Sequence, residues 1–139
     1  MSPRGTGHTR EMSTSEVRSR AAAARQFLEV AQLVIGDDHA DEYRQVSAAL
    51  AVLAGIAAAD AVCGHLLGHC SRGQDHRQAT DLLRRTREGA SVAGSLDKLL
   101  DIKDAAHYGA AAMSADRVRG ALRAASTLVE HMDRTLRPR

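Results

Sequence analysis

Apolar residues recur along most of the chain at the three- and four-residue spacing that places them on one face of an α-helix. The pattern predicts five helices, over residues 13–36, 40–68, 75–87, 95–108 and 114–136. Short loops join them, which is typical of an all-α, up-and-down bundle. We therefore expect a single helical-bundle domain over residues 13–136. Residues 1–12 are polar and contain glycine, so we expect a disordered N-terminal tail.

Several residues mark where the helices begin and end. Ser13 followed by Glu16 matches a capping box, and Gly36 is suited to end the first helix. Ser95 and Ser114 are the expected N-caps of the fourth and fifth helices. The second helix is almost wholly apolar from residue 48 to 62, which is typical of a helix in the middle of a bundle. Its expected buried stripe is Tyr43, Val46, Leu50, Leu53, Ala57, Ala61 and Leu67.

The amino-acid composition supports a helical protein but does not exclude any of the function classes considered below. Of 139 residues, 44% are hydrophobic, yet there is one Phe and no Trp, so small aliphatic side chains must form the core. The net charge of +2 is too small to indicate a nucleic-acid partner by itself. Arginines are concentrated near both ends and could contact phosphate, although solvated helix faces are the more common reason for such residues. They are Arg4, Arg10, Arg18, Arg20 and Arg25 at one end, and Arg134, Arg137 and Arg139 at the other.

The two cysteines indicate a reducing compartment. If one helix spans Cys63 and Cys70, they lie two turns apart, about 10.5 Å, which is too far for a disulfide. We expect reduced thiols in a cytoplasmic protein. The sequence shows neither a secretion signal nor an uninterrupted apolar run of membrane-spanning length, so we expect no membrane association.

Asp60 is the first candidate for a functional role, because it interrupts the apolar stretch "AGIAAADAVCG". A buried carboxylate must be paired or hydrogen-bonded. The candidate partners are Arg72, His76, Lys103 and His107. Asp60 then either anchors a structural hydrogen-bond network or orients a histidine.

Two further stretches carry residues suited to phosphate chemistry. In "SRGQDHRQA", Arg72 and His76 flank a turn that opens a helix, where backbone amides attract phosphate. In "KDAAHYG", Lys103 and His107 share a helix face and Tyr108 follows. His107 could act as a general acid or base while Lys103 binds the phosphate. The alternative is that all of these side chains are capping, packed or solvated polar groups.

A metal site is a weaker prediction. His65 and His69 are four residues apart, and Cys70 could supply a third ligand. A zinc protease helix would need Glu at position 66, which is Leu66 here. We expect surface histidines and no cofactor.

The "AAADA" of the second helix, the "GQDH" turn and "KDAAHYG" before a last long helix resemble the HEPN superfamily, in particular small stand-alone actinobacterial members. The similarity covers about residues 20–132. It implies a helical bundle, commonly a homodimer, with a link to nucleotides or nucleic acid. Many members are ribonucleases or toxins with an arginine before a late histidine and a tyrosine after it. Here His107 matches that histidine, Lys103 replaces the arginine one residue closer, and Tyr108 comes one residue early.

These observations favour a HEPN-like module that binds nucleotide or nucleic acid without robust catalysis and forms a homodimer. Its site would gather Asp60, Arg72, His76, Lys103, His107 and Tyr108. The alternative is a metal-independent ribonuclease of the toxin type, with a cognate protein partner and with His107 as general acid/base. A second alternative is a protein–protein interaction module.

Overall fold

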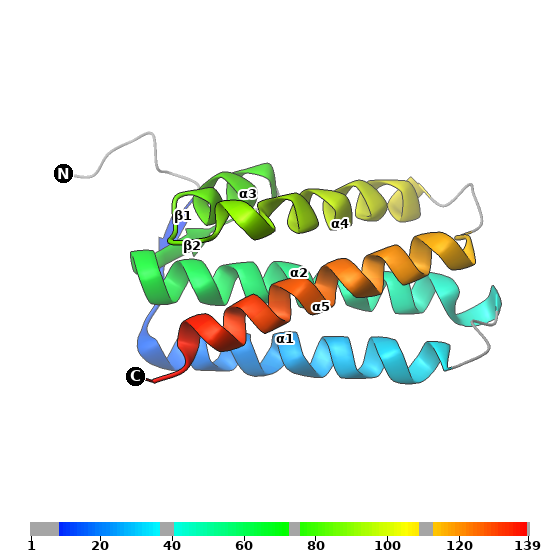
Figure 1. The fold of residues 1–139 in the computed structure, drawn as a ribbon, viewed down its shortest axis with the longest axis horizontal. Helices are drawn as coiled ribbons and strands as arrows, with labels where there is room; N and C mark the ends of the chain where they lie inside the picture. The colour runs from blue at the N-terminus through cyan, green and yellow to red at the C-terminus, as the bar shows by residue number, and fades with distance from the viewer. Residues whose placement is uncertain (1–8, 37–40, 73–75, 109–112, 139) are drawn as a thin grey trace.

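The computed structural model describes residues 9–36, 41–72, 76–108 and 113–138. Within them, five α-helices and one two-stranded antiparallel sheet form the fold, so the predicted all-α bundle is confirmed (Figure 1). The elements in chain order are β1 (Thr9–Glu11), α1 (Thr14–Ile35), α2 (Asp41–Leu67), β2 (His69–Ser71), α3 (His76–Arg84), α4 (Ala90–Tyr108) and α5 (Ala115–Leu136).

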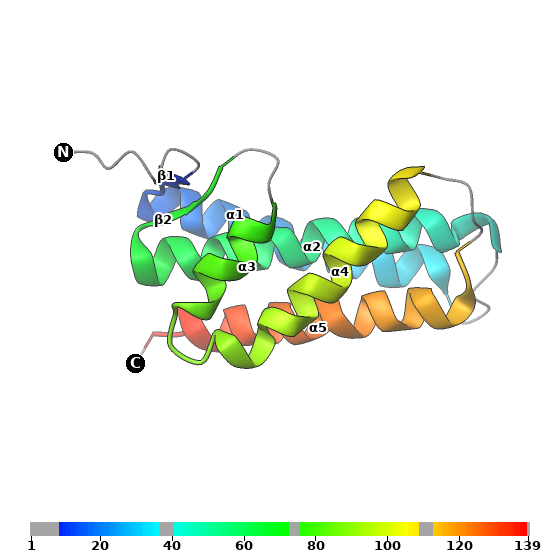
Figure 2. The same cartoon turned by 90° about the horizontal axis from the view of Figure 1, so that it is seen from above.

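Helix α2 is the centre of the bundle. In Figure 1 it lies between α1 and α4, and α5 packs along it; in Figure 2 α4 crosses it obliquely. Most of its buried side chains are alanines, which let the neighbouring helices come close. At Gly55 the approach is closest: an added Cβ would overlap Leu99 Cδ1 of α4 and lie 3.1 Å from Leu128 Cδ1 of α5.

The predicted helix starts are confirmed for α1 and α5. The Ser13 hydroxyl accepts a hydrogen bond from the Glu16 amide (3.1 Å), and the Glu16 carboxylate accepts one from the Ser13 amide (2.8 Å). The hydrogen bond from the Ser13 backbone amide is the main cause of the lowered pKa of Glu16, and the bond with the Ser13 side chain is the second cause. Ser114 caps α5 by accepting from the Arg117 amide at 3.1 Å. Gly36 ends α1 with a positive φ of 57°.

The predicted start of α4 is wrong, because α4 begins at Ala90 and Ser95 lies inside it. The expected loop over residues 88–94 is therefore mostly helical. Its small residues are compatible with a helix, and the Ser91 amide and hydroxyl both hydrogen-bond to the Glu88 carbonyl, at 3.2 and 2.7 Å. That local bonding starts the helix one turn earlier than the sequence pattern indicates.

Residues 9–12 are not the disordered tail that their composition predicts. Thr9 to Glu11 pair with β2 in the register Thr9 to Ser71, Arg10 to Cys70 and Glu11 to His69. Met12 is buried, and its amide donates to the Gly68 carbonyl at 3.0 Å. Composition could not predict this strand, because its partner β2 lies some 60 residues later in the chain.

The predicted buried stripe of α2 is wrong in its first half. Tyr43, Val46 and Leu53 are 47, 48 and 45% exposed, whereas Ala57 and Ala61 are fully buried as predicted. Because α2 is apolar on all sides, its sequence does not indicate which side the other helices cover.

The same composition makes α2 from Tyr43 to Leu67 long and apolar enough to cross a membrane, the one such helix among the described residues. Inside the bundle, 72% of its most apolar stretch is buried. The central helix of a bundle has these properties as well.

The close approach at Gly55 predicts that glycine-to-alanine substitutions at Gly55 and at Gly120 change the free energy of unfolding in opposite directions. Gly55→Ala should lower the free energy of unfolding by about 1 kcal/mol, because displacing the packed Leu99 costs more than the gain in helix propensity. Gly120→Ala on α5, where an added Cβ meets nothing within 4 Å, should raise it by about 0.5–1 kcal/mol. Urea unfolding followed by circular dichroism measures both, and stabilisation by Gly55→Ala would contradict the packing described.

Candidate functional site

Asp60 is paired with Arg20, which is not one of the partners predicted for it. The Arg20 guanidinium donates to the Asp60 carboxylate at 2.8 Å, and the two side chains are 32 and 12% exposed. Neither Arg72 nor Lys103 makes the predicted contact with Asp60 among the described interactions. The sequence did not point to Arg20 because that pairing depends on α1 and α2 being antiparallel neighbours, which places a residue 40 positions earlier in the chain beside Asp60. The predicted contacts of Asp60 with His76 and His107 stay predictions.

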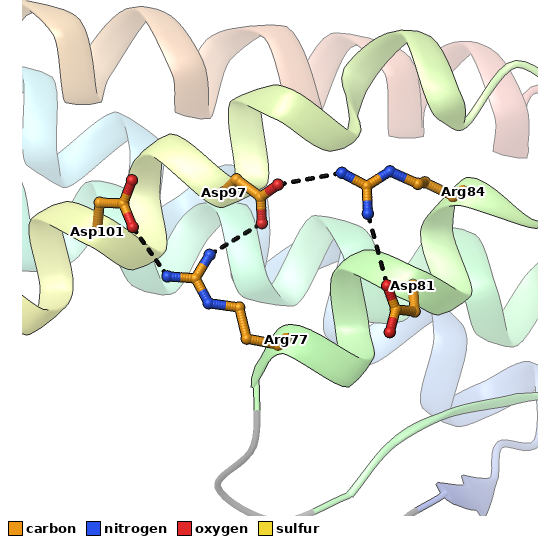
Figure 3. A network of polar contacts seen from close by, with 5 residues as sticks. All are labelled: Arg77, Asp81, Arg84, Asp97 and Asp101. Atoms are coloured by element: carbon orange, nitrogen blue, oxygen red, sulfur yellow. Dashed lines mark hydrogen bonds and ion pairs between the residues drawn. The ribbon is translucent and has the colours of Figure 1, made fainter.

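Near the helix start in "SRGQDHRQA", the positive charge of Arg77 is neutralised by carboxylates of α4. Arg77 donates to Asp97 (3.0 Å) and Asp101 (2.8 Å) of α4, as Figure 3 shows. The bond to Asp101 is the largest cause of the raised pKa of Arg77. Arg84 extends the network to Asp97 and Asp81, at 3.2 and 3.5 Å. These carboxylates join α3 to α4 and would repel a phosphate near them.

Of the other predicted phosphate ligands, the structure describes the side chains of Arg72 and Lys103, and neither contacts Asp60. Arg72 is exposed after β2, and Lys103 is half-buried on α4; neither forms an ion pair with a described residue. His76 is the first residue of α3, and His107 and Tyr108 lie in the last turn of α4. The side chains of these three lie outside the described part of the chain, so their predicted roles stay predictions.

The candidate metal ligands do not converge. α2 ends at Leu67, and Gly68 turns the chain with a φ of 84°. His65 is therefore exposed on the helix, while His69 and Cys70 belong to β2. Across the described residues, no group of three His, Cys, Asp or Glu side chains is placed to hold a metal ion.

Both thiols are free and buried, but not for the geometric reason that the sequence suggested. Cys63 is on α2 and Cys70 on β2, so they do not share a helix. Burial, followed by the negative charge of Asp60, raises the pKa of Cys63 to about 12 and raises that of Cys70 as well. Protonated thiols are poor nucleophiles and poor metal ligands.

The Arg20–Asp60 ion pair lies at one end of a surface that is otherwise apolar. The Ser47 hydroxyl donates to the Ala31 carbonyl at 2.8 Å, so this bond and the ion pair set the register of α1 against α2. Positions seven residues apart lie on nearly the same helix face. Phe27 and Val34 lie seven and fourteen residues after Arg20 on α1. Leu53 and Val46 lie seven and fourteen residues before Asp60 on α2. The register places Phe27 level with Leu53, and Val34 level with Val46.

We call this surface the α1/α2 face. It comprises Phe27, Val30, Val34, Tyr43, Val46, Leu50 and Leu53. Val30 is 42% exposed and Tyr43, Val46 and Leu53 are exposed to a similar degree; the other three are half-buried. Leu33, which is 70% exposed, lies on the same half of α1. Soluble monomers rarely expose so many large apolar side chains together, so the face has the character of an interaction surface.

The sequence contained a signal for this face. Phe27 and Val34 are seven residues apart and give α1 a second apolar side, which continues the row that begins at Arg20. This side is separate from the core side of α1, which is formed by Ala24, Ala31 and Ile35.

Comparisons with family models, with curated proteins and with solved structures found no match for this chain.

The buried thiols predict slow chemical modification. At pH 8 native Cys63 should hold about a thousandfold less thiolate than an ordinary thiol, and iodoacetamide should alkylate it only after unfolding in guanidinium chloride. Because the pKa is raised on folding, the stabilisation is complete below pH 9 and is lost as the pH rises from 9 towards 12. Native alkylation at the unfolded rate would contradict this.

The dispersed cations predict little ribonuclease activity. With metal chelated, a mixed RNA pool incubated with the purified protein should stay intact, because Arg77 is neutralised and Arg72 and Lys103 are not gathered with Asp60. The matched variant is His107→Ala. Cleavage by the wild type that disappears in His107→Ala would establish the ribonuclease alternative instead.

Proposed function

We propose that this protein is a non-catalytic interaction module and that it forms a homodimer through the α1/α2 face. The exposed apolar side chains of that face carry the proposal. Burying them against a partner would gain roughly 25 cal/mol for each Å² of apolar surface removed from water.

The chemistry of the face favours a second copy of this chain as the partner. Its seven residues are uncharged, so it offers no charge pattern to select a different partner. A two-fold axis through the face would pack two antiparallel helix pairs against each other, with the same residues contributed by each copy. The resemblance to HEPN proteins, which are commonly homodimers, agrees with this arrangement. The Arg20–Asp60 pair would then lie at the polar rim.

A charge placed in the centre of the face should prevent association. Leu53→Glu and Val46→Glu should each convert a particle of twice 14.8 kDa into one of 14.8 kDa, as measured by sedimentation velocity at micromolar concentration. Neither change should unfold the bundle, because both side chains are already about half exposed. Circular dichroism melting checks this.

Leu66→Glu is the matched control, because it makes the same change on the same helix at a side chain that is 42% exposed but outside the face. It should remain dimeric. A monomeric wild type, or equal dissociation by Leu53→Glu and Leu66→Glu, would refute the proposal. Binding of the wild type to neutral lipid vesicles, lost in Leu53→Glu, would assign the face to a membrane instead.

The hypotheses of nucleic-acid binding and of toxin-type cleavage depend on Lys103 and His107, and the RNA incubation described above tests the second. The two free, buried thiols support the further proposal of a cytoplasmic location.

A further inference from the structure

A polar cavity lies at the end of the bundle where α2 and α5 finish. Its volume is about 440 Å³, within the range of small-molecule sites. It is bounded by the end of α2, the turn between α3 and α4, and the last turns of α5. Its lining residues include Arg87, Glu88, His131, Arg134 and Arg137.

The cavity carries unbalanced positive charge. Arg87, Arg134 and Arg137 line it against one carboxylate, that of Glu88. None of the three arginines forms an ion pair with a described residue. By contrast, Arg25 of α1 is paired with Asp133 of α5 at 2.8 Å. Three unpaired guanidinium groups around one concave surface are suited to an oxyanion.

His131 supplies an independent observation. Its side chain lines the cavity but is only 3% exposed, and its Nε2 atom is buried with no hydrogen-bond partner among the described residues. A polar atom buried in this way is unfavourable unless something completes its hydrogen bonding. Burial, and then the charge of Arg134, lowers the pKa of His131, while Glu88 acts in the opposite direction. The ring lies against the cavity wall, so an anion bound in the cavity would raise its pKa again.

The turn that bears Arg87 and Glu88 is held in an unfavourable conformation. Glu88 has a φ of 62°, the only positive φ among described residues other than glycine. A Cβ on Gly89 would overlap the Leu83 carbonyl oxygen, which also accepts from the Thr86 hydroxyl at 2.6 Å. Packing thus maintains a strained turn, and the turn places both charged residues on the cavity wall.

We infer that this cavity binds the phosphate group of a small phosphate monoester. The arginines match the charge and the bidentate geometry of a phosphate. The volume exceeds what a phosphate fills, and Leu66 and Pro138 provide apolar wall for an organic group. The site does not depend on the proposed dimer, because Leu66 is 13 residues, about 20 Å, along α2 from Leu53 of the α1/α2 face.

Calorimetric titration at constant ionic strength tests the inference, with phenyl phosphate and inorganic phosphate as probes. Wild-type protein should bind phenyl phosphate saturably at one site per chain, and more tightly than inorganic phosphate. Arg134→Gln should weaken this binding about tenfold or more. Glu88→Gln should strengthen it, because a competing carboxylate is removed.

Arg123→Gln is the matched control, since it removes the same charge from an exposed position of α5 outside the cavity, and it should change the affinity less than twofold. In NMR spectra of histidine-labelled protein, phenyl phosphate should move the His131 signals and raise the pKa of that ring. If Arg134→Gln perturbs folding, Arg87→Gln tests the same prediction from the turn.

Three results would overturn the inference. One is the absence of binding heat and of a His131 shift with both probes. Another is equal weakening by Arg134→Gln and Arg123→Gln, which would indicate only a general charge effect. Equal affinity for the two probes would overturn the assignment of a monoester.

Discussion

The close packing of three helices against the small side chains of α2 is the constraint on which the fold depends. The buried alanines of α2 leave room for the backbones of its neighbours, and at Gly55 there is space for not even a methyl group between α2 and Leu99. Such packing needs no large aromatic core, which is consistent with the single Phe of the chain. It also uses only part of the α2 surface. The apolar side chains from Tyr43 to Leu53 that the other helices leave uncovered are the α2 part of the α1/α2 face.

Charge is distributed around this apolar centre in two different ways. Most cations at helix contacts are matched by carboxylates: Arg20 by Asp60, Arg77 by Asp97 and Asp101, and Arg84 by Asp81 and Asp97. The Arg20–Asp60 pair positions α1 on α2. The pairs that Arg77 and Arg84 form with Asp97 and Asp101 position α3 on α4 (Figure 3). Among the described residues the arginines of the terminal cavity have no such partners, and neither does the Nε2 atom of His131 beside them. The difference distinguishes cations that hold the fold together from cations that are available to a ligand.

The two surfaces lie at different ends of α2, so association and ligand binding can occur in the same molecule. The α1/α2 face lies along the first half of α2, and the cavity begins at Leu66 near its end. A dimer formed through the face would leave both cavities open. The buried thiols, His65 and His69 contribute to neither surface.

The sequence by itself determined the local features: five helices, the capping box of Ser13 and Glu16, the Ser114 cap, and the Gly36 end of α1. Each depends on residues within one or two turns, so spacing along the chain was sufficient to predict it. Only the tertiary structure decided that Arg20 pairs with Asp60, that residues 9–11 form a strand, and that Tyr43 and Leu53 are exposed. Those outcomes depend on which distant elements pack together, and α2 is equally apolar on every side that they could cover.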